Sequence, residues 1–486
     1  MTQPASLPSD FDDFVNNSLR QWGVPGAAVA IVKDDEMVFA QGYGVREVGR
    51  DAPMDEHTIF GIGSAAKAFT AAAVAALVDD GKLHWDDPVI EHLADFQLSD
   101  PWVTRQVTLR DLLCHRTGLP RGVGILLRSG IDLETYLHRY RHAEFEHSFR
   151  SRYLYSNTNF DWAGQVVEAV SGQGWGEFVA RRIFEPLEMT ASSTNVAALK
   201  NAANLSAPHA LLKGELKAIP RLDIGDDPAG SINTSAADMA QWLRLQLAGG
   251  RYAGAQVLSP DAVREMHAPQ MAVPHPEESE VAPLYMLHPT TNFWTYGFGW
   301  WVQDYHGAKL VWHGGQINGY ASMVAMLPGE NFGFAVLTNI HETFLHGLLM
   351  FTLLDAYLEV PARDWNADCQ KLAQGYGAQQ AAQAQKIQSA RVEGTSPSLP
   401  LSEYAATFVD PWQGRVQIIV ENGELSLRYG RSTAKLSHWH YDTFRLIWQD
   451  PLFSPEFVTF TLDARGKADR IKVGSLTEFK REPAAT

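Results

Sequence analysis

The first 80 residues contain hydrophobic patterns typical of helices and of strands. The apolar stretches 27–33 and 37–45, separated by Asp-Asp-Glu, predict a β-hairpin. A longer run of Ala, Val, Phe and Leu at 64–80 predicts a buried helix, ended by Gly81. Between residues 10 and 22, apolar residues three or four positions apart predict an amphipathic helix: Phe11, Phe14, Val15, Leu19 and Trp22.

The middle of the chain alternates between helical patterns and loops, and then changes to strands. Between residues 86 and 215, segments 108–114 and 160–170 show clear helical patterns. A further helix begins after Ser235, which is placed to cap it, and ends at Gly249-Gly250. From 296 to 340, four apolar runs separated by turns such as Pro-Gly-Glu-Asn predict an antiparallel meander.

The composition changes near residue 365, and this change marks a domain boundary. Residues 370–398 are rich in Ala and Gln and end in a Pro- and Ser-containing stretch, which predicts a polar helix followed by a linker. From residue 400, short apolar runs with regular turn signals predict a small all-β domain, most simply a barrel. We therefore divide the chain into domain 1–365, helical and polar linker 366–398, and β domain 399–486.

Composition and charge exclude several classes of protein. The 486 residues carry a formal net charge of −16, which argues against a nucleic-acid binder, because such a protein needs a basic face. Cys114 and Cys369 are too isolated for a disulfide framework or a zinc site, and they fit the reducing cytoplasm. The N-terminus does not read as a signal peptide, and the apolar run 24–32 is too short to span a bilayer. We expect a cytoplasmic protein with no membrane partner.

Two Ser-x-x-Lys pairs raise the question of a nucleophile: Ser64 with Lys67, and Ser432 with Lys435. About one such pair is expected by chance, so the spacing alone decides nothing. At the start of the 64–80 helix, Lys67 shares a face with Ser64, and the helix N-terminus favours an alkoxide and an adjacent oxyanion. The second pair lies among predicted strands, where residues three apart point to opposite faces, or in a loop.

Two further segments offer groups that an activated serine needs. Tyr155 and Asn157 place a phenol and a carboxamide two residues apart, suited to a general base and to holding a lysine and a substrate carbonyl. Residues 312–316, Trp-His-Gly-Gly-Gln, end a predicted strand, where a substrate backbone could pair and a main-chain N–H could complete an oxyanion hole. In the alternative, purely structural interpretation, Tyr155 is a core residue and Asn157 belongs to a turn. His313 is then half-buried, and Gly314-Gly315 form a hairpin turn.

The order Ser-x-x-Lys, Tyr-x-Asn, His-Gly-Gly resembles the serine hydrolases related to class C β-lactamases and low-molecular-weight penicillin-binding proteins. The resemblance runs from about residue 10 to 345 and includes the flanking segments 112–119, 183–189, 228–239, 313–320 and 327–339. It implies an α/β fold with an antiparallel sheet flanked by helices, a helical lobe, and the site between them. The C-terminal segment resembles the small lipocalin-like barrel that follows some of these hydrolases.

The resemblance implies catalytic roles for three residues and a binding role for a fourth. Ser64 is expected to be the nucleophile, and Lys67 and Tyr155 to share the acid–base work of acylation and deacylation. Asn157 is expected to position Lys67 and the acyl carbonyl. The resemblance implies no metal and no cofactor.

The substrate-binding segment departs from most of the family. The main-chain N–H groups of Ser64 and Gln316 are expected to form the oxyanion hole, beside Gly314 and Gly315. His313 stands where most β-lactamases and penicillin-binding proteins have Lys, and a neutral histidine offers a substrate carboxylate no permanent cation. His-Gly-Gly resembles the D-aminopeptidase branch and related esterases. We therefore predict a peptidase of the D-aminopeptidase type that acts on small peptides.

Other interpretations stay open. A carboxylesterase acting on small acyl esters, or a weak β-lactamase, would use the same machinery, and a scaffold or binding module could retain the fold without activity. The expected partner is a small molecule or short peptide. The barrel either caps the cleft or mediates assembly into a homo-oligomer.

Four more features admit a functional and a structural interpretation. Cys114 matches a structural loop of the family better than a nucleophile. The histidines of His438-Trp-His share a strand face but have no third metal ligand nearby. Asp226 and Asp227 either bind a substrate amine at the mouth of the cleft or are loop charges. Tyr320 is a weaker candidate for the cleft.

Overall fold

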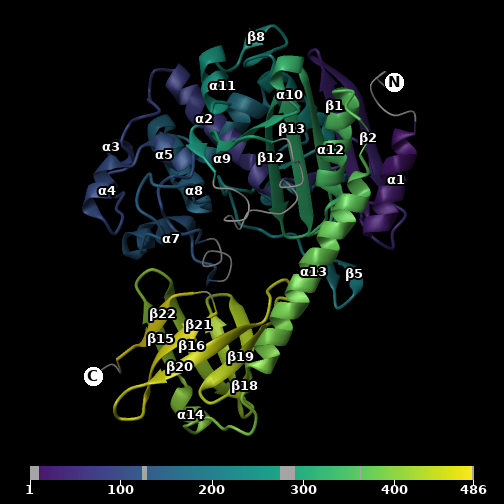
Figure 1. Cartoon of the computed structure of the whole chain (residues 1–486). Coiled ribbons are helices and arrows are strands. Elements are labelled where there is room, and N and C mark those ends of the chain that lie inside the picture. The colour runs from purple at the N-terminus through teal and green to yellow at the C-terminus, as the bar shows by residue number, and fades with distance from the viewer. Residues whose placement is uncertain (1–9, 123–128, 274–290, 362, 475, 484–486) are drawn as a thin grey trace. The chain divides into compact units, whose positions relative to one another are not determined.

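The structure is a computed structural model that describes residues 10–122, 129–273, 291–361, 363–474 and 476–483 (Figure 1). Contacts divide the chain into two units. The first unit draws on residues 1–96, 102–121 and 145–374, and the second on residues 97–101, 122–144 and 375–486. The chain therefore passes from the first unit to the second more than once.

An antiparallel sheet forms the centre of the first unit, in the order β2-β1-β14-β13-β12-β11-β10-β9. The predicted hairpin and meander are both confirmed, and pairing of Ala28 with Leu337 joins them. The predicted run at 296–302 is divided, because the chain turns at Gly299, whose φ is +74°. The strands are β1 (Gly26–Lys33), β2 (Glu36–Gly44), β9 (Met271–Ala272), β10 (Trp294–Tyr296), β11 (Trp301–Tyr305), β12 (Ala308–Ile317), β13 (Tyr320–Leu327) and β14 (Phe332–Thr338).

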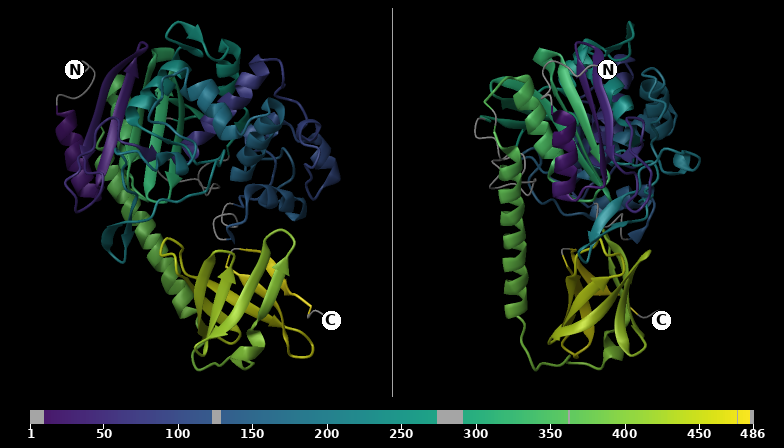
Figure 2. Two further views of the ribbon diagram at one scale, coloured as in Figure 1. Left: turned by 180° about the vertical axis from the view of Figure 1, so that it is seen from behind. Right: turned by 90° about the vertical axis from the view of Figure 1, so that its right-hand side faces the viewer.

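Helices cover both faces of this sheet, which explains why β13 and β14 are buried along their whole length. Helix α10 (Ala236–Leu247) packs against β1 and β14. Helices α1 (Phe11–Trp22) and α12 (Leu345–Tyr357) lie on the other side of the sheet (Figure 2, right). The predicted helix at 10–22 is confirmed, and so is the Ser235 cap, whose hydroxyl accepts from the Asp238 N–H.

A group of helices lies beside the sheet and includes the helix that follows Ser64. That helix differs from the prediction at its start: a 3₁₀ turn, η1 (Gly63–Ala66), precedes α2, and Gly81 follows its end with a φ of +69°. Helix α2 packs against α8, α9 and α11. The helices of this group are α2 (Lys67–Asp79), α3 (Val89–His92), α5 (Leu109–Leu113), α8 (Asn157–Ser171), α9 (Trp175–Val179) and α11 (Pro260–Met266), and α4 (Pro101–Gln106) lies between α3 and α5 in sequence.

The second unit contains the predicted β domain, which is a closed barrel because β15 pairs with β22. Its interior is filled by aromatic side chains such as Phe408, Phe444 and Phe460. Residues 129–144, with α7 (Leu133–Arg139), also belong to this unit, and the ring of Tyr140 packs 5.7 Å from that of Trp412. The strands are β15 (Ala406–Asp410), β16 (Gly414–Glu421), β17 (Glu424–Tyr429), β18 (Ser432–His440), β19 (Thr443–Trp448), β20 (Glu456–Leu462), β21 (Ala468–Val473) and β22 (Glu478–Arg481).

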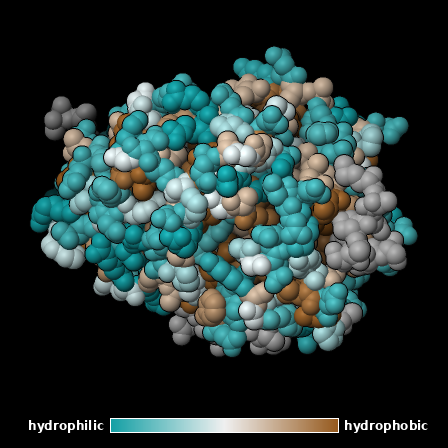
Figure 3. Space-filling view, turned by 90° about the horizontal axis from the view of Figure 1, so that it is seen from above, coloured by the Kyte–Doolittle hydropathy of each residue, from teal (hydrophilic) through white to brown (hydrophobic). Residues whose placement is uncertain are grey.

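The predicted polar helix is α13 (Trp365–Ser389), which begins before residue 370 and runs from the first unit into the second. Within the described residues, none of the helices combines the length and the apolar composition that a bilayer span requires. Hydrophilic side chains cover most of the face shown in Figure 3, and hydrophobic ones there form small separate groups.

Candidate active site

Ser64 lies in the η1 turn, and Lys67 is the first residue of α2. Lys67 is completely buried, whereas Ser64 is half-buried. The Lys67 Nζ donates one hydrogen bond to Ser64 Oγ, at 3.2 Å, and another to the main-chain oxygen of Ala229, at 2.7 Å. A buried lysine is thus anchored by a carbonyl and directed at the serine, as a proton-transfer partner must be.

Two glycines allow the Ser64 turn to lie directly against β12. A Cβ atom on Gly63 would be 2.6 Å from the main-chain nitrogen of Gln316, and one on Gly315 would be 1.8 Å from the Ile62 oxygen. Ser322 on β13 also holds this turn, because its hydroxyl donates to the Ile62 oxygen at 2.7 Å. The main chain of Gln316 therefore lies next to the nucleophile turn.

The strand that carries these glycines does not end at them. Strand β12 continues through Gly314 and Gly315 to Ile317, with Gly315 opposite Ser322. The strand thus ends one residue beyond the predicted segment 312–316. The alternative of a hairpin turn at the two glycines is wrong. Strand β11 pairs with β12 only as far as Trp312, so the Ser64 turn packs where β11 has already left the strand.

Tyr155 and Asn157 reach the site at the start of α8. The Lys67 Nζ lies 5.0 Å from the centroid of the Tyr155 ring. The Asn157 Oδ1 is buried and accepts no hydrogen bond. The expected hydrogen bond from Lys67 to Asn157 is therefore not made, and the Ala229 oxygen holds the lysine in its place.

His313 is fully buried rather than half-buried. Its Nδ1 lies 2.6 Å from the Gly314 oxygen and its Nε2 lies 2.9 Å from the Tyr296 hydroxyl. Because a carbonyl can only accept, we assign the proton to Nδ1, and Nε2 then accepts from Tyr296. Burial, together with the charge of Lys67, lowers the pKa of His313 to about 3, so the ring is neutral at pH 7.

His115 is a site residue that the sequence did not single out. Its Nδ1 accepts from the Ser156 N–H at 3.2 Å, and its ring lies 4.4 Å from that of Tyr155. Burial lowers the pKa of His115 well below its usual value, so it too is neutral. Its backbone has a φ of +59°. The segment 112–119, which carries the family resemblance, was the available signal.

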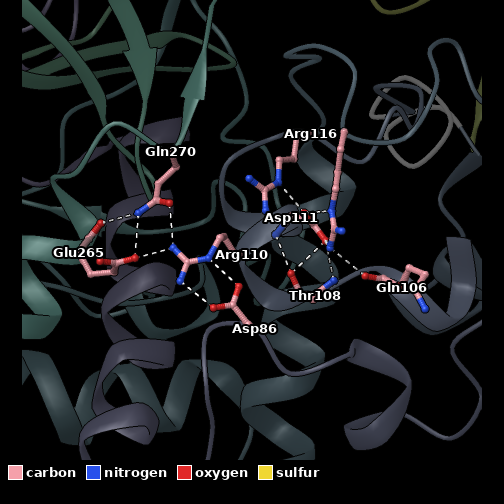
Figure 4. A network of polar contacts seen from close by, with 9 residues as sticks. Asp86, Gln106, Thr108, Arg110, Asp111, Arg116, Glu265 and Gln270 are labelled. Atoms are coloured by element: carbon pink, nitrogen blue, oxygen red, sulfur yellow. Dashed lines mark hydrogen bonds and ion pairs between the residues drawn. The ribbon is translucent and has the colours of Figure 1, made fainter.

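A buried carboxylate fixes the loop that carries His115 (Figure 4). The Asp111 side chain accepts from Arg116 Nε at 2.5 Å, from Arg150 Nη2 at 2.7 Å and from the Thr108 N–H at 2.9 Å. Burial alone would raise the pKa of Asp111, but Arg150, Thr108 and Arg116 outweigh it and hold that pKa below its usual value. Because these bonds are charge-assisted, they hold the loop, and hence His115, firmly against Tyr155.

The remaining candidates lie outside the chemistry. Burial raises the pKa of the Cys114 thiol to about 12, which leaves it unreactive. Asp227 is buried rather than at a cleft mouth, and Asp226 accepts from Thr194 and Asn195. Among the described residues, no group of three or more His, Cys, Asp or Glu side chains could hold a metal ion.

Tyr320 lines a small pocket beyond Gln316. Its hydroxyl bonds to the Ser206 oxygen, and the Arg221 guanidinium stacks on its ring, 5.0 Å from the centroid. The other residues that line this pocket include Gly61, Ser231, Asn233 and Ile317.

Ser432 and Lys435 lie on β18 in the barrel. Lys435 is exposed, while Ser432, on the other face of the strand, is partly buried and pairs with Tyr429. The prediction that strand geometry separates these two side chains is confirmed.

Comparison with protein-family models matches residues 11–354 to the family described as Beta-lactamase and residues 390–484 to a domain of unknown function, DUF3471. The chain is 28% identical over 434 residues to unguisins hydrolase ungD' of Aspergillus campestris, covering 85% of this chain and 78% of that protein. The octameric penicillin-binding protein homologue of Pyrococcus abyssi has this fold, with a TM-score of 0.62 at 20% identity over 97% of this chain and 98% of that one. SurE, solved with D-Leu, gives a TM-score of 0.55 at 20% identity over the same shares, 97% and 98%.

Proposed function

This chain is a serine hydrolase that belongs to the β-lactamase family, and from that premise we propose that it is a peptidase of the D-aminopeptidase type. The observation that carries the proposal is the contact of a fully buried Lys67 Nζ with Ser64 Oγ at 3.2 Å. In the proposed reaction, Ser64 attacks the carbonyl carbon of an amide and forms an acyl-enzyme, which water then hydrolyses.

Proton transfer in this reaction falls to Lys67 and Tyr155. As the Ser64 O–C bond forms, the serine proton passes to this pair, which returns a proton to the leaving amine as the C–N bond breaks. The Lys67 Nζ already contacts Ser64 Oγ and lies 5.0 Å from the Tyr155 ring centroid, so the three groups lie close together. In deacylation, Tyr155 activates water and the proton returns to Ser64.

Charge on the tetrahedral intermediate is met by main-chain N–H groups of Ser64 and Gln316. The close approach of Gly63 to the Gln316 nitrogen supports this pairing. The buried, unpaired Asn157 Oδ1 supports a role in accepting a substrate N–H, since a buried acceptor without a partner is costly.

The choice of peptides over β-lactams rests on His313. Its pKa of about 3 makes it neutral, so position 313 offers no cation to a substrate carboxylate. An amide substrate whose binding does not need a carboxylate next to residue 313 fits this site better than a ligand that needs a cation there. The name of one similar protein, unguisins hydrolase, supports hydrolysis, and the D-Leu named with the SurE structure supports substrates that include D-residues.

A carboxylesterase is the second candidate, because the same Ser64, Lys67 and oxyanion groups would cleave a small ester at least as readily. The alternative of a scaffold without activity does not apply to a serine hydrolase. We also propose a homo-oligomer, supported by the octameric homologue of known structure, and light scattering of the purified chain tests it.

Four substrates compared side by side test the proposal: D-Ala-p-nitroanilide, L-Ala-p-nitroanilide, p-nitrophenyl butyrate and nitrocefin. We expect labelling of Ser64 by a fluorophosphonate and a preference for the D-amide over the L-amide and nitrocefin. An enzyme that turns over only the ester would be the carboxylesterase. Labelling that persists in Ser64→Ala would refute the assigned nucleophile.

A further inference from the structure

We propose that Asp161 and Asp227 form a buried carboxyl pair with one shared proton, and that this pair positions Lys67 by holding the loop 227–231. The inference rests on the proposed roles of Ser64 and Lys67, and it adds two positioning residues to them. Both carboxyl groups belong to the first unit and lie in its interior, 2% and 8% exposed.

The loop 227–231 is wedged between α2 and α8. The Thr70 hydroxyl on α2 donates to the Pro228 oxygen at 2.7 Å. On the other side, a Cβ atom on Gly164 of α8 would be 2.2 Å from the Pro228 ring, so only glycine admits the loop there. One residue further on, the Ala229 oxygen accepts from Lys67 Nζ. A displacement of this loop would therefore move the lysine.

Asp227 fixes the conformation of this loop. Its Oδ1 accepts from the Ala229 N–H at 2.7 Å, and its own N–H donates to Ser231 Oγ at 2.8 Å. The Ser231 hydroxyl in turn donates to the Asp227 main-chain oxygen at 2.9 Å. The main chain of Ala229 thus lies between two side chains: its N–H donates to the Asp227 carboxyl, and its oxygen accepts from Lys67 Nζ.

Asp161 supplies the other half of the pair from α8. Its side chain is hydrogen-bonded to that of Asp227, and two carboxyl groups can share such a bond only when one of them carries a proton. The second oxygen of Asp161, Oδ1, is buried and has no partner. A neutral carboxylic acid tolerates an unpaired oxygen in the interior far better than a carboxylate does.

The surroundings assign the proton to Asp161. The Asp227 carboxyl accepts from the Ala229 N–H at 2.7 Å, which favours its carboxylate form, while the Gly230 N–H donates to the Asp227 main-chain oxygen at 3.1 Å. Burial and the charge of Asp227 raise the pKa of Asp161 well above its usual value. The charge of Lys67 lowers the pKa of both carboxyl groups, because it attracts the negative charge on Asp227.

Two substitutions at Asp161 separate hydrogen bonding from packing. Asp161→Asn keeps a neutral donor to Asp227, and we expect Ser64 to be labelled by a fluorophosphonate within about threefold of the wild-type rate. Asp161→Leu fills similar space but leaves the Asp227 carboxylate unpaired, and we expect labelling and kcat to fall about 100-fold with little change in KM. Asp238→Asn is the matched control: this buried carboxyl bonds to Ser192 and Ala191, so the labelling rate should stay at the wild-type value.

An infrared measurement tests the shared proton without relying on activity. Near pH 7, the wild-type spectrum minus the Asp161→Asn spectrum should contain the carbonyl stretch of a protonated carboxylic acid. The wild-type spectrum minus the Ser64→Ala spectrum should not contain this band. Absence of that band would overturn the proposal even if Asp161→Leu does not fold. Equal losses in Asp161→Asn and Asp161→Leu would overturn it too. If no peptide is cleaved by any variant, the peptidase proposal fails, while the labelling rates and the infrared band still decide this one.

Discussion

The two Ser-x-x-Lys segments have the same spacing and opposite surroundings. In the first, Lys67 is fully buried and its Nζ contacts Ser64 Oγ. In the second, Lys435 points away from the barrel into solvent while Ser432 lies on the other face of the strand. Residues three apart share a face on a helix and lie on opposite faces of a strand. The comparison shows that a Ser-x-x-Lys spacing brings the two side chains together only where the segment is helical.

The interiors around the two serines also differ in how many ionisable side chains they bury. The first unit buries ionisable side chains close to Ser64, among them Lys67, His115 and His313. The described part of the barrel buries mainly aromatic and aliphatic side chains, with Gln413 as a polar exception. Buried polar groups cost stability unless they are paired, so their concentration in one unit marks where that cost serves a function.

The largest expected effect comes from removing each serine hydroxyl in turn. Ser64→Ala should lower kcat by about 10⁴-fold or more and abolish fluorophosphonate labelling, because the nucleophile is lost. Ser432→Ala should leave kcat within twofold of wild type. Steady-state kinetics on one substrate compare the two. If the Ser432 variant were as inactive as the Ser64 variant, the assignment of Ser64 rather than Ser432 as the nucleophile would be contradicted.

The two lysines should separate nearly as far. Lys67→Met keeps the length of the side chain but removes the proton-transfer group, so kcat should fall by about 10³-fold. Lys435→Met changes an exposed side chain and should have almost no effect on kcat. Pre-steady-state acylation rates measure the difference directly. A Lys67 variant that acylates at the wild-type rate would rule out the assigned role.

A substitution that only moves the Ser64 turn should have a smaller effect. Gly315→Ala places a Cβ atom 1.8 Å from the Ile62 oxygen and 2.9 Å from the Ala65 nitrogen, so the turn must shift. We expect kcat to fall by about 100-fold, since misplacing a nucleophile by about 1 Å costs that much. Gly329→Ala is the control, because a Cβ atom there has no atom within 4 Å. Equal activities would show that the approach of β12 to Ser64 is unimportant.

The smallest effect concerns pH and stability in the first unit. Burial lowers the pKa of His267 to about 3, whereas the unfolded chain protonates it near 6.5. Between these values the unfolded state binds more protons, so stability falls with decreasing pH by about 1.4 kcal/mol per pH unit for such a histidine. Urea unfolding of His267→Gln between pH 6.5 and about pH 4 should therefore give a flatter slope than wild type. Parallel profiles would contradict the assignment.

Much of the fold follows from local pattern. The helix at 10–22, the hairpin of β1 and β2, the meander and the β domain are all readable from periodicity, because each depends on neighbouring residues. The division of 296–302 at Gly299 was not readable, and neither was the continuation of β12 through Gly314-Gly315. In both places tertiary packing decides whether the chain turns at a glycine or continues as a strand. Assignment of residues 129–144 to the barrel unit depends on contacts such as that of Tyr140 with Trp412, which are far apart in sequence.

The sequence by itself determined which residue types meet: a serine one turn before a lysine, a Tyr-x-Asn segment and a His-Gly-Gly strand, in an order shared with one family of hydrolases. Only the tertiary structure decided what each of them contacts. Lys67 bonds to the Ala229 oxygen rather than to Asn157, His313 is neutral because it is buried, and Asp227 pairs with Asp161 instead of facing solvent. The reason is physical: hydrogen-bond partners and burial depend on segments brought together from distant parts of the chain, and no local pattern encodes them.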